Sequence, residues 1–348
     1  MFVGTCSAYY ATQTTSNVWD PKVLRGLAQT CNVGEVNHAQ ITFENQLGLA
    51  KISNGGFAST MVGCTLNGTL PLVYKEFGVR LWPRSKHRFS ECSRELFMTT
   101  VAWQSAPQFV SPIMHFGIHE AFTDSVRSHT PFLVSMDHGT SLDSFLSRPV
   151  NFTLTMSDKR NLCLRLLGGL AALHAAGVFH GDIRAANVVL SPSRPDSLVY
   201  IDFGLSRREP ADGRPEDGFR RHRWTSGTIG PIAAAPGSVY APEYGRGGPT
   251  SATDMWALAP ILVRILIRDA ADALRGINDD NTNRNVRDIL KKRRPYEFVG
   301  RAIWQRIMDC TLNDPTKRPS ARSLLRLFKA STIDPRKQQL IMGKGTSS

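Results

Sequence analysis

Three polar residues within a stretch of 21 positions constrain the fold of this 348-residue chain more than any other feature. Asn187 follows Asp182 by five residues, and Asp202 follows Asn187 by 15. A short hairpin between Asn187 and Asp202 would return the second carboxylate to the first. One carboxylate that accepts a proton from an attacking hydroxyl, with an amide and a second carboxylate that hold Mg²⁺, suits metal-assisted phosphoryl transfer.

These residues belong to longer motifs that resemble those of the protein-kinase superfamily. The sequence from His180 to Asn187 reads H-G-D-I-R-A-A-N and that from Asp202 to Gly204 reads D-F-G; the kinase signatures are H-R-D-L-x-x-x-N and D-F-G. Later matches, in the order of the family, are Ala241-Pro242-Glu243, Asp254-Met255-Trp256 and the run from Asp314 to Pro319. The resemblance covers roughly residues 46–330.

The resemblance implies an α+β, bilobal protein-kinase-like fold, with a small β-rich N-lobe and a larger helical C-lobe. The hydrophobic pattern agrees, because strand-like segments dominate up to about residue 136 and helical periodicity begins near residue 157. We expect the N-lobe over residues 46–138 and the C-lobe over 139–330. Residues 1–45 are expected to form an N-terminal extension whose order the sequence leaves open, and residues 331–348 a basic tail.

The resemblance also implies roles for the polar residues of the two central motifs. Asp182 would be the catalytic base, and Arg184 would contact the γ-phosphate of ATP. Asn187 and Asp202 would hold Mg²⁺ against the nucleotide phosphates. The chain would thus transfer the γ-phosphate of ATP to protein substrates.

Lys75, at the end of a predicted strand, resembles the V-A-I-K lysine that neutralises the α- and β-phosphates. The helix predicted to follow, over about residues 89–103, must supply a carboxylate to hold this ammonium group. Glu91 and Glu95 are both candidates. Glu95 is favoured, because the residues three, four and seven positions after it would then face the core, whereas Glu91 would place charged residues there.

The nucleotide itself is expected between a glycine-rich turn and the segment that joins the lobes. The turn matches the kinase glycine motif at only one of four named positions, although its two glycines tolerate the backbone angles that a phosphate-binding turn needs. Met136 is expected to be the gatekeeper at the back of the adenine site. The expected nucleotide-contacting residues are Ile52, Ser53, Asn54, Gly55, Gly56, Phe57, Thr60, Lys75, Glu95, Met136, Asp137 and His138.

Departures from the kinase pattern bear on regulation and on the acceptor. Gly181 replaces the arginine that in many kinases pairs with a phosphorylated loop, so activity is not expected to need that phosphate. The sequence around Arg184 resembles the catalytic loop of tyrosine kinases. The segment before Ala241 lacks the Pro and Trp typical of that class, and Ser238 could hydrogen-bond to Asp182. We therefore predict transfer to serine or threonine.

Two late motifs are expected to contact each other. In the kinase family the glutamate of A-P-E pairs with the arginine of the D-P-x-x-R-P motif, and here these residues are Glu243 and Arg318. Such a pair would be largely removed from water. Loss of either partner would therefore leave an uncompensated buried charge.

Composition limits the compartment and the partners. The net charge is 42 − 29 = +13, which favours acidic or phosphorylated partners that bind basic loops; nucleic acid is not indicated beyond this charge. The six cysteines include no CxxC pair and suggest reduced thiols in the cytoplasm or nucleus. The N-terminus does not resemble a signal peptide, and no apolar segment approaches the roughly 20 residues of a membrane span.

Several alternatives stay open at the level of sequence. A tyrosine or dual-specificity kinase is suggested by the loop at Arg184. A small-molecule kinase of the aminoglycoside or choline type shares the His-Gly-Asp start but lacks the later motifs. A pseudokinase scaffold is suggested by the degraded glycine motif. The presence of all four chemical residues, Lys75, Asp182, Asn187 and Asp202, argues against a pseudokinase. The eroded motifs also resemble divergent kinases of large DNA viruses, herpesviruses among them, which would place the protein in a host cell.

Overall fold

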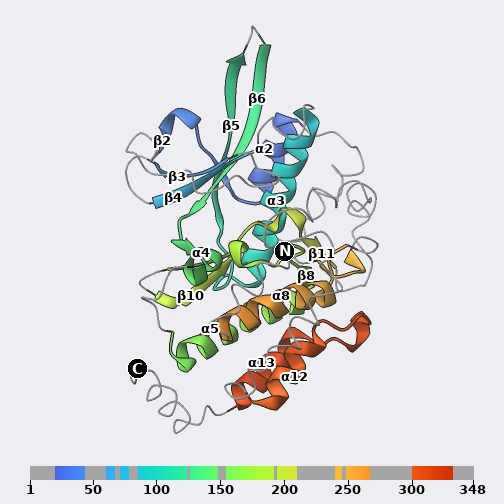
Figure 1. Ribbon diagram of the computed structural model, residues 1–348. Coiled ribbons are helices and arrows are strands. Elements are labelled where there is room, and N and C mark those ends of the chain that lie inside the picture. Colours follow the sequence, from blue (N-terminus) through green and yellow to red (C-terminus); the bar gives the residue numbers. More distant parts are fainter. Residues whose placement is uncertain are drawn as a thin grey trace.

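The computed structural model describes residues 20–43, 60–66, 71–77, 85–123, 126–147, 154–191, 194–209, 240–244, 248–266 and 300–331. These residues form a β-rich lobe above a mainly helical lobe (Figure 1). The bilobal α+β architecture expected from the sequence is therefore confirmed. The described elements that position the site come from both lobes.

The described part of the upper lobe contains a six-stranded sheet with the order β1-β5-β6-β4-β3-β2. All neighbouring strands are antiparallel except β1 and β5, which are parallel. Its strands are β1 (Gly34–Glu35), β2 (Ile41–Phe43), β3 (Thr60–Leu66), β4 (Pro71–Glu76), β5 (Ile113–Thr123) and β6 (Val126–Met136). Strand β4 is the predicted strand with Lys75 near its end, and it pairs with β3 in antiparallel fashion.

Two helices accompany this sheet (Figure 1). Helix α3 (Ser85–Ser105) is the helix predicted over residues 89–103, and it contacts β6 and β5. Helix α2 (Pro21–Thr30) packs against α3 through an apolar side that includes Leu24 and Leu27. The backbone N–H of Val23 donates to Asp20 Oδ1 at 2.9 Å, so an aspartate caps the first turn of α2.

The expected boundary of the upper lobe at residue 46 is corrected by these contacts. Residues 20–43 contribute α2, the short helix η1 (His38–Gln40) and strands β1 and β2, so they belong to the lobe and not to an extension outside it. Hydrophobic periodicity gave little sign of this because α2 is only ten residues long and β1 and β2 are two and three. Residues 1–19 lie outside the described part of the chain.

The two faces of the sheet have separate cores. Leu72 and Tyr74 of β4 belong to a small apolar cluster that also contains Val134 of β6. Lys75 faces the other way, toward α3, because successive side chains of a strand point to opposite faces. Leu133, directly opposite Lys75, belongs to the main core.

The lower lobe is built on helices that surround a small set of short strands. Helix α5 (Met156–Ala175) begins with a capping box in which Thr155 and Asp158 satisfy each other's backbone N–H groups. The other described helices are α4 (Leu142–Ser147), α8 (Ser251–Leu266), α12 (Arg301–Asp309) and α13 (Ala321–Ala330), with the short helices η3 (Ala185–Asn187), η4 (Phe203–Leu205) and η7 (Pro315–Lys317). The strands are β7 (Thr140–Ser141), β8 (Val178–Phe179), β9 (Val188–Ser191), β10 (Arg194–Tyr200) and β11 (Arg207–Arg208).

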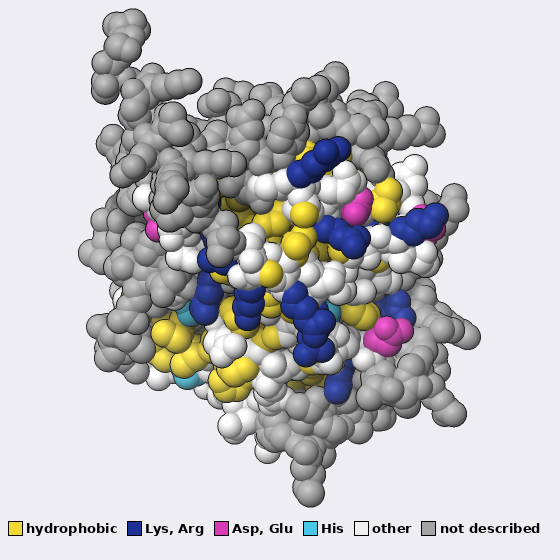
Figure 2. All heavy atoms as spheres, turned by 90° about the horizontal axis from the view of Figure 1, so that it is seen from below, with side chains coloured by type: hydrophobic (Ala, Val, Ile, Leu, Met, Phe, Trp, Pro, Cys, Tyr) yellow, Lys and Arg dark blue, Asp and Glu magenta, His cyan; other side chains and the backbone are white. Residues whose placement is uncertain are grey.

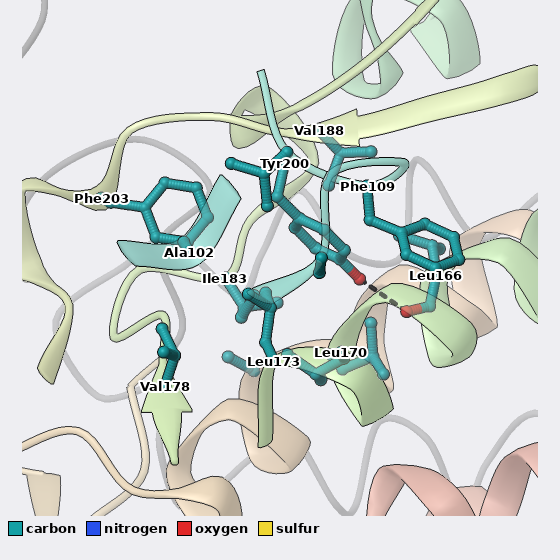
Figure 3. Close-up of a cluster of buried hydrophobic side chains, with 14 of the residues drawn as sticks. Ala102, Phe109, Leu166, Leu170, Leu173, Val178, Ile183, Val188, Tyr200 and Phe203 are labelled. Atoms are coloured by element: carbon teal, nitrogen blue, oxygen red, sulfur yellow. Dashed lines mark hydrogen bonds between the residues drawn. The ribbon is translucent and has the colours of Figure 1, made fainter. Parts of the chain in front are cut away.

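Strands β9 and β10 form the hairpin that the spacing of Asn187 and Asp202 predicts. Tyr200, at the end of β10, is fully buried and lies among aliphatic side chains of α5 (Figure 3). Its hydroxyl donates to the backbone oxygen of Leu166 at 2.8 Å, which removes the cost of burying an unpaired phenol. The hairpin is thereby fixed to the core of the lower lobe, with Asp202 two residues beyond this anchor.

Most of α8 is apolar, and its side chains are largely buried despite Pro260 in its interior. No helix in the described ranges is both long and apolar enough to cross a bilayer. Viewed from below, the α12–α13 end of the molecule shows many more basic than acidic side chains (Figure 2). Exposed basic residues of these helices are Arg301, Arg306, Arg322, Arg326 and Lys329.

Candidate active site

Three charged side chains meet where the lobes face each other, and we call Lys75, Glu95 and Asp202 the lysine cluster. Lys75 Nζ lies 2.7 Å from each carboxylate oxygen of Glu95 and 3.0 Å from Asp202 Oδ1. Strand β4 supplies the lysine, α3 the glutamate, and the residue just before η4 the aspartate. Of the two candidate glutamates, Glu95 is the one that contacts Lys75, in agreement with the helical periodicity.

Burial and charge act against each other within the lysine cluster. Burial raises the pKa of Glu95 to about 7, although the neighbouring ammonium group opposes this shift. Burial alone would lower the pKa of Lys75, but Asp202 and Glu95 outweigh it and raise that pKa. Burial likewise opposes ionisation of Asp202, yet Lys75 and Arg184 hold the pKa of its carboxyl below the ordinary value. The cluster therefore favours a charged lysine and a charged Asp202.

The catalytic loop, residues 180–187, holds Asp182 through several hydrogen bonds. Asn187 Nδ2 donates to Asp182 Oδ2 at 2.8 Å and to the backbone oxygen of Asp182 at 2.9 Å. Arg184 Nε lies 3.4 Å from the same Oδ2. The hydroxyl of Tyr240 donates to Asp182 Oδ1 at 2.9 Å. The carboxylate is thus restrained at both oxygens and is largely buried.

The oxygen donors of Asp202 and Asn187 are of the type that suits a hard cation which also binds phosphate. Asp202 has left-handed backbone angles, with φ 64°, and turns its carboxylate toward Lys75 at the start of η4. Among the described residues, no group of three or more His, Cys, Asp or Glu side chains could hold a metal by itself. An amide oxygen and a carboxylate that share Mg²⁺ with phosphate oxygens and water match the coordination this ion prefers.

The structure corrects the expected position of the gatekeeper. Met136 pairs with Leu72, whose side chain lies in the cluster on the face away from Lys75, and Met136 is 38% exposed. Directly opposite residues of an antiparallel pair share a face, so Leu133, opposite Lys75 and 1% exposed, lies behind the lysine. Side chains alternate between the two faces of β6, but the sequence does not show which face Met136 occupies until the register of β6 with β4 is known.

Of the other expected nucleotide-contacting residues, some lie within the described part of the chain and some lie outside it. Residues 52–57 lie outside the described residues, and Thr60 is described only as the first residue of β3. The carboxylate of Asp137 accepts the backbone N–H of Gly139 at 2.7 Å, which shapes the turn that leads into β7. His138 Nε2 lies 2.9 Å from Ser111 Oγ, and burial lowers the pKa of this histidine.

Two residues around the site could not be identified from sequence. Arg94, next to Glu95, donates to the backbone oxygen of Ser206 at 2.9 Å and so links α3 to the chain after D-F-G. Tyr240 contacts Asp182, and Ser238, which the sequence suggests as another partner of this carboxylate, lies outside the described residues. A tyrosine before A-P-E gives no sequence signal of its own, because only the fold places it beside Asp182.

Asp254, in contrast, carries a motif signal and has a structural role. Its carboxylate accepts the backbone N–H groups of His180 and Gly181, both at 2.9 Å. His174 Nε2 also lies 3.0 Å from Asp254 Oδ2. Helix α8 therefore fixes the backbone of the catalytic loop from below.

The sequence profile of the protein kinase domain matches residues 113–327, more than half of the chain. The chain belongs to the protein kinase domain family. The profile begins in β5, after Lys75 and Glu95, so the upper part of the lysine cluster is supported by the structure and not by the profile.

Curated kinases similar to this chain include both serine/threonine and receptor types. The fibroblast growth factor receptor of Halocynthia roretzi is 26% identical over 239 residues, 65% of this chain and 28% of the receptor. The serine/threonine-protein kinase mos of Patiria pectinifera is 23% identical over 308 residues, covering 86% of this chain and 77% of that protein. Cold-responsive protein kinase 1 of Arabidopsis thaliana is 24% identical over 312 residues, covering 80% and 69%. The chain thus spans less than a third of the receptor it resembles.

In this member of the family, the backbone conformation explains the glycine that replaces the H-R-D arginine. Gly181 has φ +78°, which disfavours any other residue, and a Cβ atom there would lie 2.6 Å from the backbone oxygen of Leu205. A side chain at position 181 would therefore require the chain after D-F-G to move. The backbone of this loop therefore does not accommodate an arginine at position 181.

The expected ion pair between the two late motifs is confirmed. Both terminal nitrogens of Arg318 contact the carboxylate of Glu243, Nη2 at 2.9 Å from Oε2. Arg318 also donates to the backbone oxygens of Leu312 and Ala252 and lies over the ring of Trp256. This arginine joins the A-P-E segment to α8 and to the chain before α13.

Proposed function

We propose that this kinase transfers the γ-phosphate of ATP to serine or threonine of protein substrates, with Mg²⁺ as its metal. The observation that carries the proposal is a pair of contacts, Lys75 with Asp202 and Asn187 with Asp182, whose segments are joined by a backbone hydrogen bond from Ile201 to Asn187. In kinases the lysine, the base and the metal ligands must be in place together. The contact between Lys75 and Asp202, 127 residues apart in sequence, supports this assignment.

Each residue has a distinct task in the proposed reaction. The acceptor hydroxyl attacks the γ-phosphorus, the bond from that phosphorus to the ADP oxygen breaks, and the hydroxyl proton passes to Asp182. Lys75 offsets negative charge on the α- and β-phosphates, and Arg184 can contact the γ-phosphate. Mg²⁺ held by Asn187 and Asp202 would neutralise charge on the phosphate oxygens.

Serine or threonine is favoured over tyrosine by the surroundings of Asp182. The hydroxyl of Tyr240 already contacts this carboxylate at 2.9 Å, and we infer that a slim acceptor side chain fits beside it more easily than a second aromatic ring. The two serine/threonine or plant kinases described above align with at least 80% of this chain, whereas the receptor aligns with 65%. The sequence of the catalytic loop around Arg184 resembles that of tyrosine kinases and is the observation that favours tyrosine.

The test uses the full chain with Mg²⁺, labelled ATP and generic acceptor proteins such as casein. We expect phosphoserine and phosphothreonine on acid hydrolysis, with autophosphorylation of Thr225, Ser226 or Thr228, and no transfer by the Asp182→Ala variant. Predominant phosphotyrosine would contradict the acceptor class. Nucleotide binding without any transfer would indicate a scaffold, and transfer only to an aminoglycoside or choline would indicate a small-molecule kinase.

Two further expectations belong to this proposal. The excess of basic residues, including those exposed on α12 and α13, favours acidic or phosphorylated protein partners. The resemblance to kinases of large DNA viruses stays a hypothesis, because the three relatives described above come from animals and a plant. Interaction proteomics with the Asp182→Ala variant as bait would identify the partners.

A further inference from the structure

A tyrosine hydroxyl contacts the carboxylate to which we assign the role of base. Tyr240 is 8% exposed, and its hydroxyl donates to Asp182 Oδ1 at 2.9 Å. The other oxygen of Asp182 accepts from Asn187 and lies near Arg184. Among the described residues, Tyr240 therefore restrains Oδ1 of Asp182, whereas residues of the catalytic loop hold Oδ2.

The phenol ring of Tyr240 is itself held in place. It lies against the ring of Tyr244, with centroids 4.7 Å apart, in a buried cluster with Leu205. The hydroxyl of Tyr244 donates to the backbone oxygen of Gly181 at 2.6 Å. Two tyrosines that flank Ala241-Pro242-Glu243 thus contact two consecutive residues of the catalytic loop.

We propose that Tyr240 is a positioning residue for Asp182, an inference that rests on the proposed function. An ionised carboxylate offers about two acceptor positions on each oxygen. The phenol uses one position of Oδ1 and fixes the rotation of the carboxylate, while the second position of Oδ1 is left to the acceptor hydroxyl. In this arrangement Tyr240 acts through Asp182 and touches neither nucleotide nor substrate.

The test compares two variants that each remove one buried tyrosine hydroxyl. Tyr240→Phe deletes the contact with Asp182, and Tyr200→Phe deletes the bond to the Leu166 backbone oxygen in the core. Because hydrogen bonds to charged groups are the stronger ones, we expect Tyr240→Phe to lower kcat about tenfold while the KM for ATP stays unchanged. Tyr200→Phe should lower the melting temperature with little change in kcat.

A double-mutant cycle separates positioning from a general structural effect. If Tyr240 acts only through the Asp182 carboxylate, adding Tyr240→Phe to Asp182→Asn should lower the remaining rate by less than about twofold. A structural effect would instead lower the rate by the same factor in both backgrounds. MgADP binding, followed by the shift in melting temperature, verifies that each variant is folded.

The outcomes are distinct. An equal tenfold loss in both backgrounds, or an unchanged kcat for Tyr240→Phe, overturns the inference and leaves the proposed function intact. A higher kcat overturns it as well, because the phenol would then occupy the place of the acceptor hydroxyl. A wild-type protein that transfers phosphate to no acceptor overturns the proposed function and this inference with it.

Discussion

The lysine cluster and the catalytic loop lie close together but are held by different forces. In the lysine cluster, one ammonium group bridges two carboxylates that come from a helix and from the other lobe. In the catalytic loop, the Asp182 carboxylate is held mainly by neutral donors, the amide of Asn187 and the phenol of Tyr240. The first arrangement joins separate elements, and the second orients one side chain within its own lobe.

This difference predicts different responses to mutation. Removing one member of a buried ion pair leaves an uncompensated charge and disturbs every element that the pair joined. Removing a neutral hydrogen bond to a carboxylate costs less and acts locally. Substitutions in the lysine cluster should therefore change nucleotide binding together with turnover, whereas those at Asp182 and Tyr240 should change turnover alone.

The largest effect is expected for Asp202→Ala. This change removes the proposed metal ligand, which is also one of the two carboxylates that stabilise the charge on Lys75. Metal ions contribute several kcal/mol of charge stabilisation, so we expect turnover to fall by about 10³-fold or more. Calorimetric titration with ADP, with and without Mg²⁺, should show that the Mg²⁺-dependent part of binding is lost. Full activity with Mg²⁺ would refute the metal assignment.

Asp182→Asn is expected to have the next largest effect. The amide keeps the shape of the side chain but cannot accept a proton, so turnover should fall by about 10²–10⁴-fold. The affinity for MgADP should stay within about twofold of wild type, since Asp182 is not part of the lysine cluster. A rate equal to that of wild type would remove Asp182 from the mechanism, and a parallel loss of nucleotide binding would remove the proposed distinction.

Much of the lower lobe could be predicted from sequence because its functional residues are close in the chain. Asp182 and Asn187 are five residues apart, and the short spacing between Asn187 and Asp202 favours the hairpin that joins them. The pair Glu243–Arg318 was predictable from two motifs of the family. Local spacing and motif order were sufficient for these positions.

The upper lobe was less predictable because its contacts depend on register and on short elements. The side of the sheet that Met136 faces follows from its pairing with Leu72, which no single strand reveals. Helix α2 is marginal as an isolated helix and is stabilised by packing on α3. Tyr240 reaches Asp182 over a separation of 58 residues, so its contact is a property of the fold alone.

A smaller effect on turnover is expected for Glu95→Gln, together with a change in pH dependence. Glutamine keeps the shape but not the charge that faces Lys75, and we expect turnover to fall about 10- to 100-fold. The pKa of Glu95 is raised to about 7 by burial, so the folded protein holds a proton that the unfolded chain releases above about pH 4.5. This group therefore stabilises the fold at low pH, and its contribution declines as the pH rises toward about 7, by at most about 1.4 kcal/mol per unit.

The difference between wild type and Glu95→Gln isolates this contribution from all other titrating groups. Denaturant unfolding of nucleotide-free protein at several pH values should show the free energy of unfolding of wild type declining, relative to the variant, between about pH 4.5 and 7. A difference that stays constant across this range would show that Glu95 is ionised throughout, and that the lysine cluster carries two full negative charges.

The smallest effect on turnover is expected for Leu24→Ala in α2, which supports the lysine cluster only through α3. Leu24 is fully buried between the two helices, so its truncation should lower the free energy of unfolding by about 2–5 kcal/mol. Because Lys75 and Arg94 still hold α3 from the other side, turnover well below the melting temperature should fall only a few-fold. Arg25→Ala is the matched control on the same helix, since the exposed Arg25–Glu35 pair is expected to contribute less than about 1 kcal/mol. A loss of turnover as large as that of Glu95→Gln would mean that α2, and not the ion pair, sets the position of α3.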